Sequence, residues 1–144
     1  MVRNVDHVTV AVRDAAAGLS FFCLLGFREE KSVVIAGSPF DAYMGVPGIE
    51  AEHRTLVLEN FHPRFEIQLL TYRKPAVRAD SGAGDLARTG FNHICFAVDD
   101  LDAEVARPHG RRREAAQPGH AVPRPQAGAS GRAGGLVVEL AQWA

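Results

Sequence analysis

The sequence has few of the features that define the special classes of protein. Its 144 residues include only two cysteines, Cys23 and Cys95, which stand in apolar segments without the spacing of redox or zinc motifs. We therefore expect buried, reduced thiols and no disulfide framework. No apolar run approaches the roughly 20 residues that cross a bilayer. Because the chain also enters a strand pattern at once, we expect a cytoplasmic protein with no membrane segment.

An excess of charge of either sign is also missing. Lys and Arg number 16 against 17 Asp and Glu, and the basic residues form no stripe along a predicted helix. A nucleic-acid-binding surface needs such a concentration of positive charge, so we expect no nucleic-acid partner. The length fits one domain, or two small modules that share a core.

The first seventy residues predict one strand, one helix and three further strands. Residues 5–12 alternate, with His7, Thr9 and Ala11 on one face and valines on the other, which indicates a strand. Asp14 is placed to cap a helix that ends at Gly26. Strand-like runs follow at about 27–36, 54–58 and 65–72. The Gly- and Pro-rich stretch 38–52 between the first two runs predicts a long loop.

The pattern then repeats, with 73–91 as a linker. Residues 92–98 alternate as the first strand does, and the last strands, 67–72 and 138–143, also match. The matched pairs are His7 and His93, Ala11 and Ala97, Val12 and Val98, Asp14 and Asp100, and Ala17 and Ala103. A duplicated unit is the simplest account. We therefore predict an α+β fold with two βαβββ modules, residues 1–72 and 92–144.

The duplication yields one set of candidate metal ligands. Each module contributes a polar residue from its first and its last strand: His7 and Gln68, then His93 and Glu139. Two imidazoles and two oxygen donors suit one divalent ion such as Zn, Ni, Co, Mn or Fe, and leave positions open for water or substrate. Glu66, on the same strand face as Gln68, is the alternative ligand.

The remaining candidates are weaker. Four histidines lie in sequence typical of loops and are expected to be solvated: His53, His62, His109 and His120. Five aromatic or thioether side chains are candidates for a substrate wall, with core packing as the alternative for those in the first module: Phe40, Tyr43, Met44, Tyr72 and Trp143. No motif supports a Ser or Cys nucleophile.

Four segments carry a resemblance to a known family: DHVTVAV, FEIQLLTY, NHICFAVDDLDA and VVELAQW. They resemble the signature strands of the vicinal oxygen chelate superfamily of glyoxalases, bleomycin resistance proteins and extradiol dioxygenases. The resemblance implies a cleft of curled mixed sheets, a homodimer, a small-molecule substrate, and ligands at His7, Gln68, His93 and Glu139. With a Gln at the second ligand position, the sequence resembles methylmalonyl-CoA epimerases in its ligand set. Bleomycin-binding members generally lack the ligand set, so its presence here favours an enzyme.

The expected reaction is an isomerisation or elimination on a small carbonyl or thioester substrate. The metal would stabilise charge on the substrate oxygens while Glu139 moves a proton at the adjacent carbon. Two alternatives stay open. One is Fe²⁺-dependent ring cleavage by O₂, and the other is a non-catalytic protein that holds an aromatic antibiotic between Phe40, Tyr43 and Trp143.

Residues 107–135 do not fit this fold. They contain six Arg, six Gly, four Pro and one Val, and no Leu, Ile, Phe, Met, Trp or Tyr, so they cannot supply the two strands that the second module needs. Back-translating 120–134 with suitable codons and moving one base gives the apolar stretch Lys-Leu-Val-Leu-Leu-Ala-Gly-Pro. We predict a compensated frameshift, in the gene or its sequencing, with a natural disordered insertion as the alternative.

Overall fold

The chain divides into two compact units, Met1–Ala79 and Asp80–Ala144. The computed structural model describes residues 1–77, 82, 85–107, 132–133 and 136–142. The proposed frameshift therefore lies almost wholly outside the described residues, as does Trp143. In the part of the chain that is described, no helix is long and apolar enough to cross a membrane.

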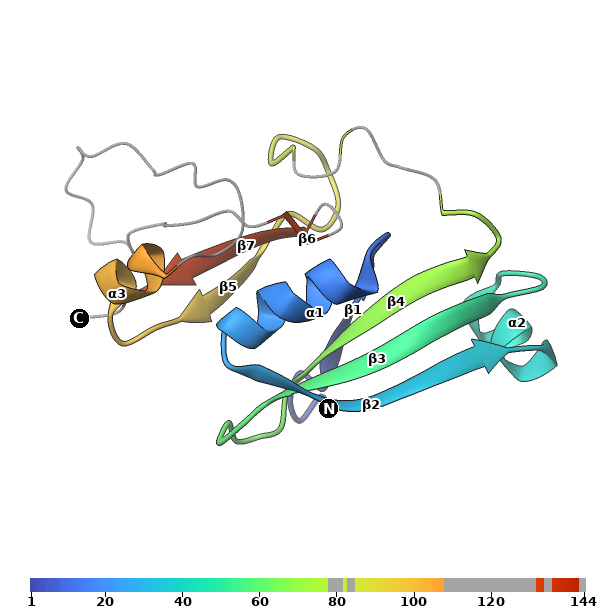
Figure 1. Ribbon diagram of the computed structural model, residues 1–144, viewed down its shortest axis with the longest axis horizontal. Helices are drawn as coiled ribbons and strands as arrows, with labels where there is room; N and C mark the ends of the chain where they lie inside the picture. The colour runs from blue at the N-terminus through green and yellow to red at the C-terminus, as the bar shows by residue number, and fades with distance from the viewer. Residues whose placement is uncertain (78–81, 83–84, 108–131, 134–135, 143–144) are drawn as a thin grey trace. The chain divides into compact units, whose positions relative to one another are not determined.

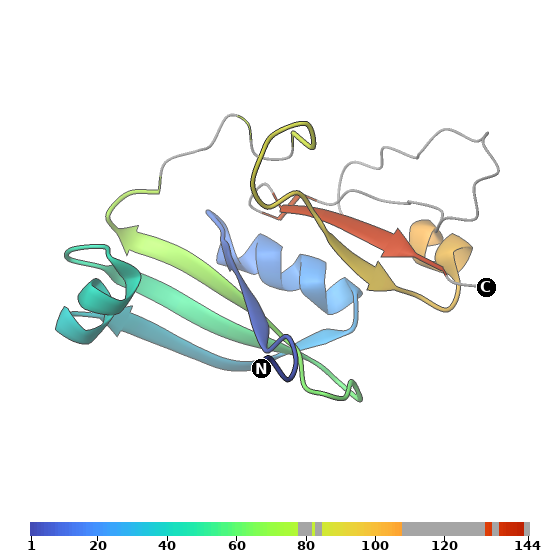
Figure 2. The same ribbon diagram turned by 180° about the vertical axis from the view of Figure 1, so that it is seen from behind.

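The first unit is a four-stranded sheet with two helices, and Figures 1 and 2 show it from opposite sides. Its elements are β1 (His7–Ala11), α1 (Ala15–Leu24), β2 (Phe27–Ala36), α2 (Ser38–Met44), β3 (Glu50–Leu58) and β4 (Glu66–Lys74). The strands lie in the order β1-β4-β3-β2. The outer strand β1 runs parallel to β4, and the other pairs are antiparallel. The predicted α+β class and the βαβββ order of this module are confirmed.

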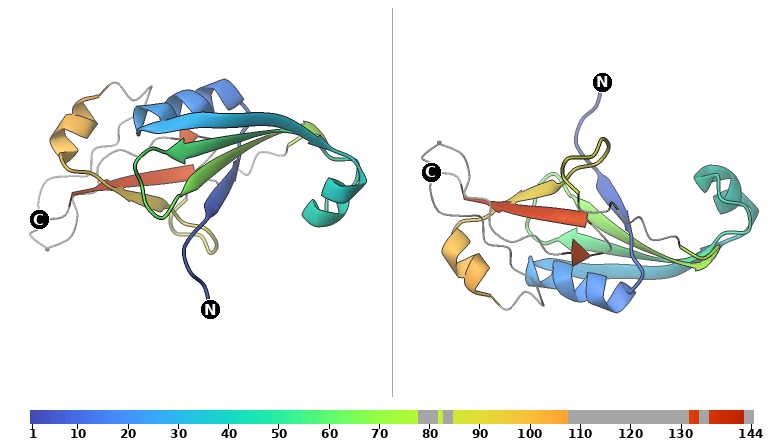
Figure 3. Two further views of the ribbon diagram at one scale, coloured as in Figure 1. Left: turned by 90° about the horizontal axis from the view of Figure 1, so that it is seen from below. Right: turned by 90° about the horizontal axis from the view of Figure 1, so that it is seen from above.

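Helix α1 covers one face of this sheet (Figure 3). Val10 and Val12 are buried, whereas the alternating His7 and Thr9 are exposed. The alternation in the sequence therefore predicted correctly which face of β1 meets the core. The helix begins where the Asp14 side chain accepts a hydrogen bond from the Ala17 amide (2.9 Å). Gly18 allows it to lie close to the sheet, because a Cβ there would be 3.1 Å from a methyl group of Leu69.

The opposite face of the sheet is apolar at one end. Ile35, Ile49, Ala51 and Leu70 form a buried cluster there. Partly buried side chains pack against this cluster: Val33, Met44, Val46 and Tyr72. The same face carries the candidate site at its other end, where β1 pairs with β4.

The segment 38–52 is not a long loop, so that expectation was wrong. Residues Ser38–Met44 form α2, with proline in its first turn and Gly45 closing it in the left-handed conformation. Proline and glycine therefore mark the two ends of a short helix here. Strand β3 then begins at Glu50, four residues before the predicted start, because its first residues pair with both β2 and β4.

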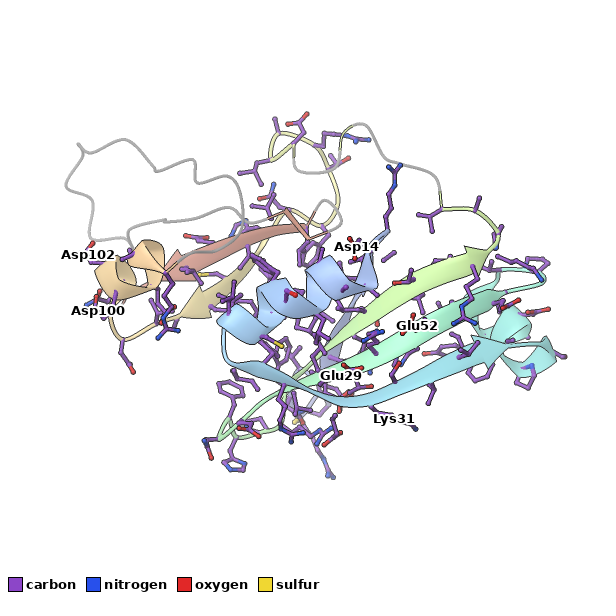
Figure 4. The ribbon with its side chains drawn as sticks, in the orientation of Figure 1. Asp14, Glu29, Lys31, Glu52, Asp100 and Asp102 are labelled. Atoms are coloured by element: carbon purple, nitrogen blue, oxygen red, sulfur yellow. The ribbon has the colours of Figure 1, made fainter. Side chains whose placement is uncertain are left out.

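The second unit contains the same first strand, helix and last strand. Its described elements are β5 (Ile94–Ala97), α3 (Leu101–Ala106), β6 (Arg132–Ala133) and β7 (Leu136–Ala141), with the strand order β5-β7-β6. Strand β5 is parallel to β7, and β6 is antiparallel to it. Asp100 caps α3 by accepting from the Ala103 amide (2.8 Å). Figure 4 labels Asp14 and Asp100 at the starts of their helices.

The repeat extends to single backbone contacts. In the first unit the Val12 amide donates to the Leu70 carbonyl (2.9 Å), and in the second the Val98 amide donates to Ala141 (2.8 Å). Val12 and Val98 were paired by the sequence repeat, and Leu70 and Ala141 are the matching last-strand positions. In each unit, therefore, the residue two positions before the helix-capping aspartate is hydrogen-bonded to the last strand.

Both cysteines are free but exposed, so the expected burial was wrong. Cys23 stands on an exposed position of α1, and Cys95 shares the exposed side of β5 with Ala97. Apolar neighbours in the sequence did not reveal which side of the element each thiol occupies, since adjacent residues on a helix or strand face different ways.

Candidate functional site

In the second unit, His93 and Glu139 lie in direct contact. The ring nitrogen Nε2 of His93 is 2.9 Å from Oε2 of Glu139, and the two side chains are 40% and 24% exposed. The other ring nitrogen, Nδ1, lies 2.7 Å from Oδ1 of Asn92. The Asn92 amide nitrogen in turn donates to the Leu86 carbonyl (2.6 Å).

These contacts fix the hydrogen positions. Because the Asn92 nitrogen faces a carbonyl, its oxygen must face His93, and an amide oxygen only accepts. Nδ1 of His93 therefore carries a hydrogen, which leaves the lone pair of a neutral ring on Nε2. That lone pair faces a carboxylate oxygen. The contact is favourable only when a positive charge lies between the two atoms, either a proton or a metal ion.

The first unit repeats the histidine part of this arrangement. Nδ1 of His7 lies 2.8 Å from Oδ2 of Asp6, the residue that matches Asn92, and the His7 side chain is also 40% exposed. An ionised carboxylate only accepts, so Nδ1 carries the hydrogen, and Nε2 is the nitrogen left available to a metal ion. A polar partner on the second nitrogen is the usual support of a metal-binding histidine.

Gln68 is held by three side chains on the same face of the sheet. Its amide oxygen lies 3.0 Å from Nε2 of His53 and accepts from the Thr9 hydroxyl (3.2 Å). Its amide nitrogen donates to Oε2 of Glu66 (3.0 Å). Arg64 donates to the second carboxylate oxygen of Glu66 (2.8 Å).

The strand register indicates that Gln68, and not Glu66, occupies the position in the first unit that is equivalent to Glu139 in the second. Gln68 pairs with Thr9, and Glu139 pairs with Cys95. Thr9 and Cys95 each stand two residues after their histidine, so the two last-strand donors occupy matching places. Glu66 lies directly beside His7 instead.

His53 is a site residue that the sequence pattern did not reveal, since its surroundings predicted a solvated loop. It is half-buried in β3, and its ring contacts Gln68. The available signal was alternation: Ala51, His53 and Thr55 share one face of a strand once β3 is extended back to Glu50. His62 is exposed, as expected, whereas His109 and His120 lie outside the described residues.

The candidate wall residues differ in their positions. Tyr43 is 82% exposed and Phe40 38% exposed on α2. Met44 and Tyr72 pack against the apolar cluster at the far end of the candidate face. Along β4, Tyr72 lies beyond Leu70 from Gln68, so the cluster separates it from the polar end of the face.

Each unit carries two of the four candidate ligands, and each such pair is called a half-site below. Among the described residues, no three His, Cys, Asp or Glu side chains gather into a group that could hold an ion. The donor chemistry nevertheless fits in the second unit: two donors each about 2.1 Å from one ion at a right angle are about 3.0 Å apart, near the 2.9 Å between His93 and Glu139.

Partial desolvation of the thiol by its neighbours, followed by the nearby Glu139 carboxylate, raises the pKa of Cys95, although the side chain is exposed overall. Cys95 therefore stays protonated at neutral pH next to the half-site when no cation is bound. A protonated thiol is a poor nucleophile, which agrees with the absence of a cysteine-protease-like motif in the sequence.

A cavity of about 400 Å³ lies at the turn between β3 and β4. None of the predicted site residues lines it. Its lining residues are Arg28, Glu30, Val57, Leu58, Glu59, Asn60, Phe61, His62 and Arg64. Arg28 pairs with Glu59 and Arg64 pairs with Glu30, so the charges there largely compensate one another.

Comparison with known proteins agrees with this architecture. Residues 6–132 match the model of the Glyoxalase/Bleomycin resistance protein/Dioxygenase superfamily, and the chain belongs to this family. No match was found among curated proteins. The resemblance noted in the sequence is thus confirmed at the level of the superfamily, which includes both enzymes and proteins without enzymatic activity.

Solved structures share the fold. A glyoxalase family protein from Bacillus cereus is 22% identical, with a TM-score of 0.83 over 99% of this chain and 95% of that one. The trypanothione-dependent glyoxalase I of Leishmania major is 16% identical, with a TM-score of 0.60 over 98% and 87%. At these identities the likeness concerns the fold.

Proposed function

We propose that the protein is a divalent-metal-dependent enzyme of the glyoxalase and epimerase type, which moves a proton on a small carbonyl or thioester substrate. The observation that carries the proposal is the His93–Glu139 contact, in which Nε2 lies 2.9 Å from a carboxylate oxygen and the pair requires a positive charge, a proton or a metal ion, to be favourable. The matching support of His7 by Asp6 and of His93 by Asn92 favours the same role for both histidines.

His7, Gln68, His93 and Glu139 would hold the ion, which would be Zn, Ni, Co, Mn or Fe. When bound, the ion supplies positive charge to substrate oxygens. The hydrogen bonds to Asp6 and Asn92 keep both imidazole rings oriented with Nε2 toward the site. Glu139 takes the proton from the carbon next to the carbonyl and returns it to the product. Met44 and Tyr72, with Phe40, Tyr43 and Trp143, would contact the apolar part of the substrate.

Metal titration tests the ligand set. We expect His7→Ala and His93→Ala each to abolish stoichiometric binding of Zn²⁺ or Co²⁺ in calorimetry, because each removes one of the two nitrogen donors. His62→Ala, which changes an exposed histidine outside the set, is the control and should bind as the wild type does. Full metal content in both site variants would refute the ligand set.

Solvent exchange tests the reaction. With metal bound, the protein should exchange the hydrogen next to the carbonyl of small 2-hydroxy ketone or acyl-thioester substrates in D₂O, and Glu139→Gln should not. Oxygen uptake with a catechol would instead indicate ring cleavage. Tight binding of an aromatic antibiotic by protein that holds no metal would favour a sequestering role.

We further propose a cytoplasmic homodimer, since the exposed edge of a small sheet is commonly covered by a second copy. Sedimentation at tens of micromolar should give the mass of a dimer. A monomer alone would exclude it.

A further inference from the structure

The Gln68 amide is held at both of its ends. Its nitrogen donates to Glu66, and its oxygen faces His53 and Thr9. The ionised Glu66 carboxylate only accepts, so the nitrogen must be on that side and the oxygen on the side of His53. Nε2 of His53 therefore carries a hydrogen and donates it to Gln68.

His53 and Glu66, the two polar partners of the amide, are themselves held in place by burial and by a salt bridge. His53 is half-buried within β3, and the Glu66 side chain is 17% exposed and bound by Arg64. Thr9 differs, because it is exposed and its hydroxyl lies farther from the amide oxygen, at 3.2 Å against 3.0 Å for His53. We expect the rotatable Thr9 hydroxyl to give way when the amide oxygen binds an ion, while His53 remains.

We infer that His53 and Glu66 are positioning residues, which together fix the Gln68 amide so that its oxygen serves as the metal ligand. The inference rests on the proposed function and deepens it. It assigns Glu66 the role of holding the ligand, in place of the alternative in which Glu66 is the ligand. It also gives a reason for an amide at position 68, since a carboxylate there would face the Glu66 carboxylate.

Co²⁺ binding to the full chain tests this role, with calorimetry for affinity and visible absorption for the coordination geometry. We expect His53→Leu to weaken Co²⁺ binding about ten-fold, the lower end of the range for residues that support a ligand. His53→Gln should recover most of the affinity, because its amide can donate to the same oxygen. Thr9→Val, which removes the other donor, should weaken binding less than His53→Leu does. His62→Leu, at an exposed histidine outside the site, is the control and should leave the affinity unchanged.

A second background separates positioning from a general structural effect. In Gln68→Ala protein, His53→Leu should cause no further loss, because the group that it positions is gone. Circular dichroism checks folding. His53→Asn, whose shorter side chain does not reach the amide, replaces the leucine variant should that one unfold and should weaken binding in the same way.

The possible failures are distinguishable. Wild-type protein that binds no Co²⁺, or an unchanged affinity in Gln68→Ala, would overturn the ligand assignment and this inference with it. A weaker Gln68→Ala together with an unchanged His53→Leu would overturn the positioning role alone. So would an equal loss from His53→Leu in both backgrounds.

Discussion

The two units build the same framework but treat the last-strand donor differently. In the second unit the donor is a carboxylate that contacts the histidine of its own half-site. In the first unit it is an amide that contacts His53 and Glu66, while His7 contacts Asp6 just as His93 contacts Asn92. The backbone positions of the two donors match, since Gln68 and Glu139 pair with equivalent residues of the first strand.

This difference shows which features a short sequence pattern determines. A histidine at the start of the strand, a capping aspartate and an alternating last strand are enough to give the same local geometry twice. The chemistry at the donor depends on neighbouring strands as well. The first unit has β3 beside β4, and β3 brings in His53, which no residue of the repeated pattern could predict.

The largest expected effect tests whether both last strands are equally important to the core. Leu69 and Leu140 occupy matching positions and are 1% and 2% exposed. We expect Leu69→Ala and Leu140→Ala each to lower the free energy of unfolding by about 2 to 5 kcal/mol in urea denaturation, since each leaves a cavity. Leu86→Ala, at a side chain that is 54% exposed, is the control. A small loss at Leu140 alone would mean that β7 is packed less tightly than β4.

Exchanging the two last-strand donors should lower the free energy of unfolding more at Gln68 than at Glu139. In metal-free protein, Gln68→Glu places a carboxylate where the amide donated to Glu66, and we expect a cost of about 1 to 3 kcal/mol. Glu139→Gln should cost less, because its amide can donate to the lone pair on His93. Denaturation of both variants measures the difference. Adding Glu66→Gln to Gln68→Glu should restore stability, and a failure to do so would show that repulsion between carboxylates is not the cause.

The helix caps should respond equally. Asp14 and Asp100 accept from the corresponding amides at 2.9 and 2.8 Å. Asp14→Ala and Asp100→Ala should each cost about 1 kcal/mol of unfolding free energy, whereas the Asn variants keep an accepting oxygen and should cost less. Unequal losses would indicate that α1 and α3 contribute differently to their units in spite of the shared cap.

The sequence could predict the parts of the fold that depend on local periodicity. The strand at His7, the Asp14 cap and the match between His7 and His93 all follow from spacing along the chain. The candidate ligands followed from the repeat of these features, and the superfamily followed from the resemblance of four segments to its signature strands.

The remaining features depend on contacts between distant segments. The start of β3 was misplaced because pairing with β2 and β4, rather than its own composition, extends it to Glu50. Helix α2 was missed because proline and glycine mark loops as often as helix ends. The exposure of Cys23 depends on which side of α1 meets the sheet, and apolar neighbours do not indicate that side.

The smallest effect concerns the end of the β3–β4 ladder. Strand β4 has nine residues and ends at Lys74, whereas its counterpart β7 has six. Glu50 and Lys74 are paired in register there, and Oε2 of Glu50 lies 3.2 Å from the lysine nitrogen. The hydrogen bond from Lys74, with a smaller contribution from Arg73, lowers the pKa of Glu50 below 4.5. A lowered pKa means that the pair adds stability above pH 4.5 and loses it as the pH falls through the lowered pKa.

Lys74→Met should therefore raise the pKa of Glu50 toward 4.5 and flatten the acid side of the stability profile, without changing stability at the lowest pH. An NMR titration of the Glu50 carboxyl carbon follows the pKa directly. Lys31→Met, which changes an exposed lysine of β2 in the same unit, is the control and should leave that titration unchanged. An unaltered Glu50 pKa in Lys74→Met would mean that the pair does not form in solution, and that the longer ladder of the first unit is held by its backbone hydrogen bonds alone.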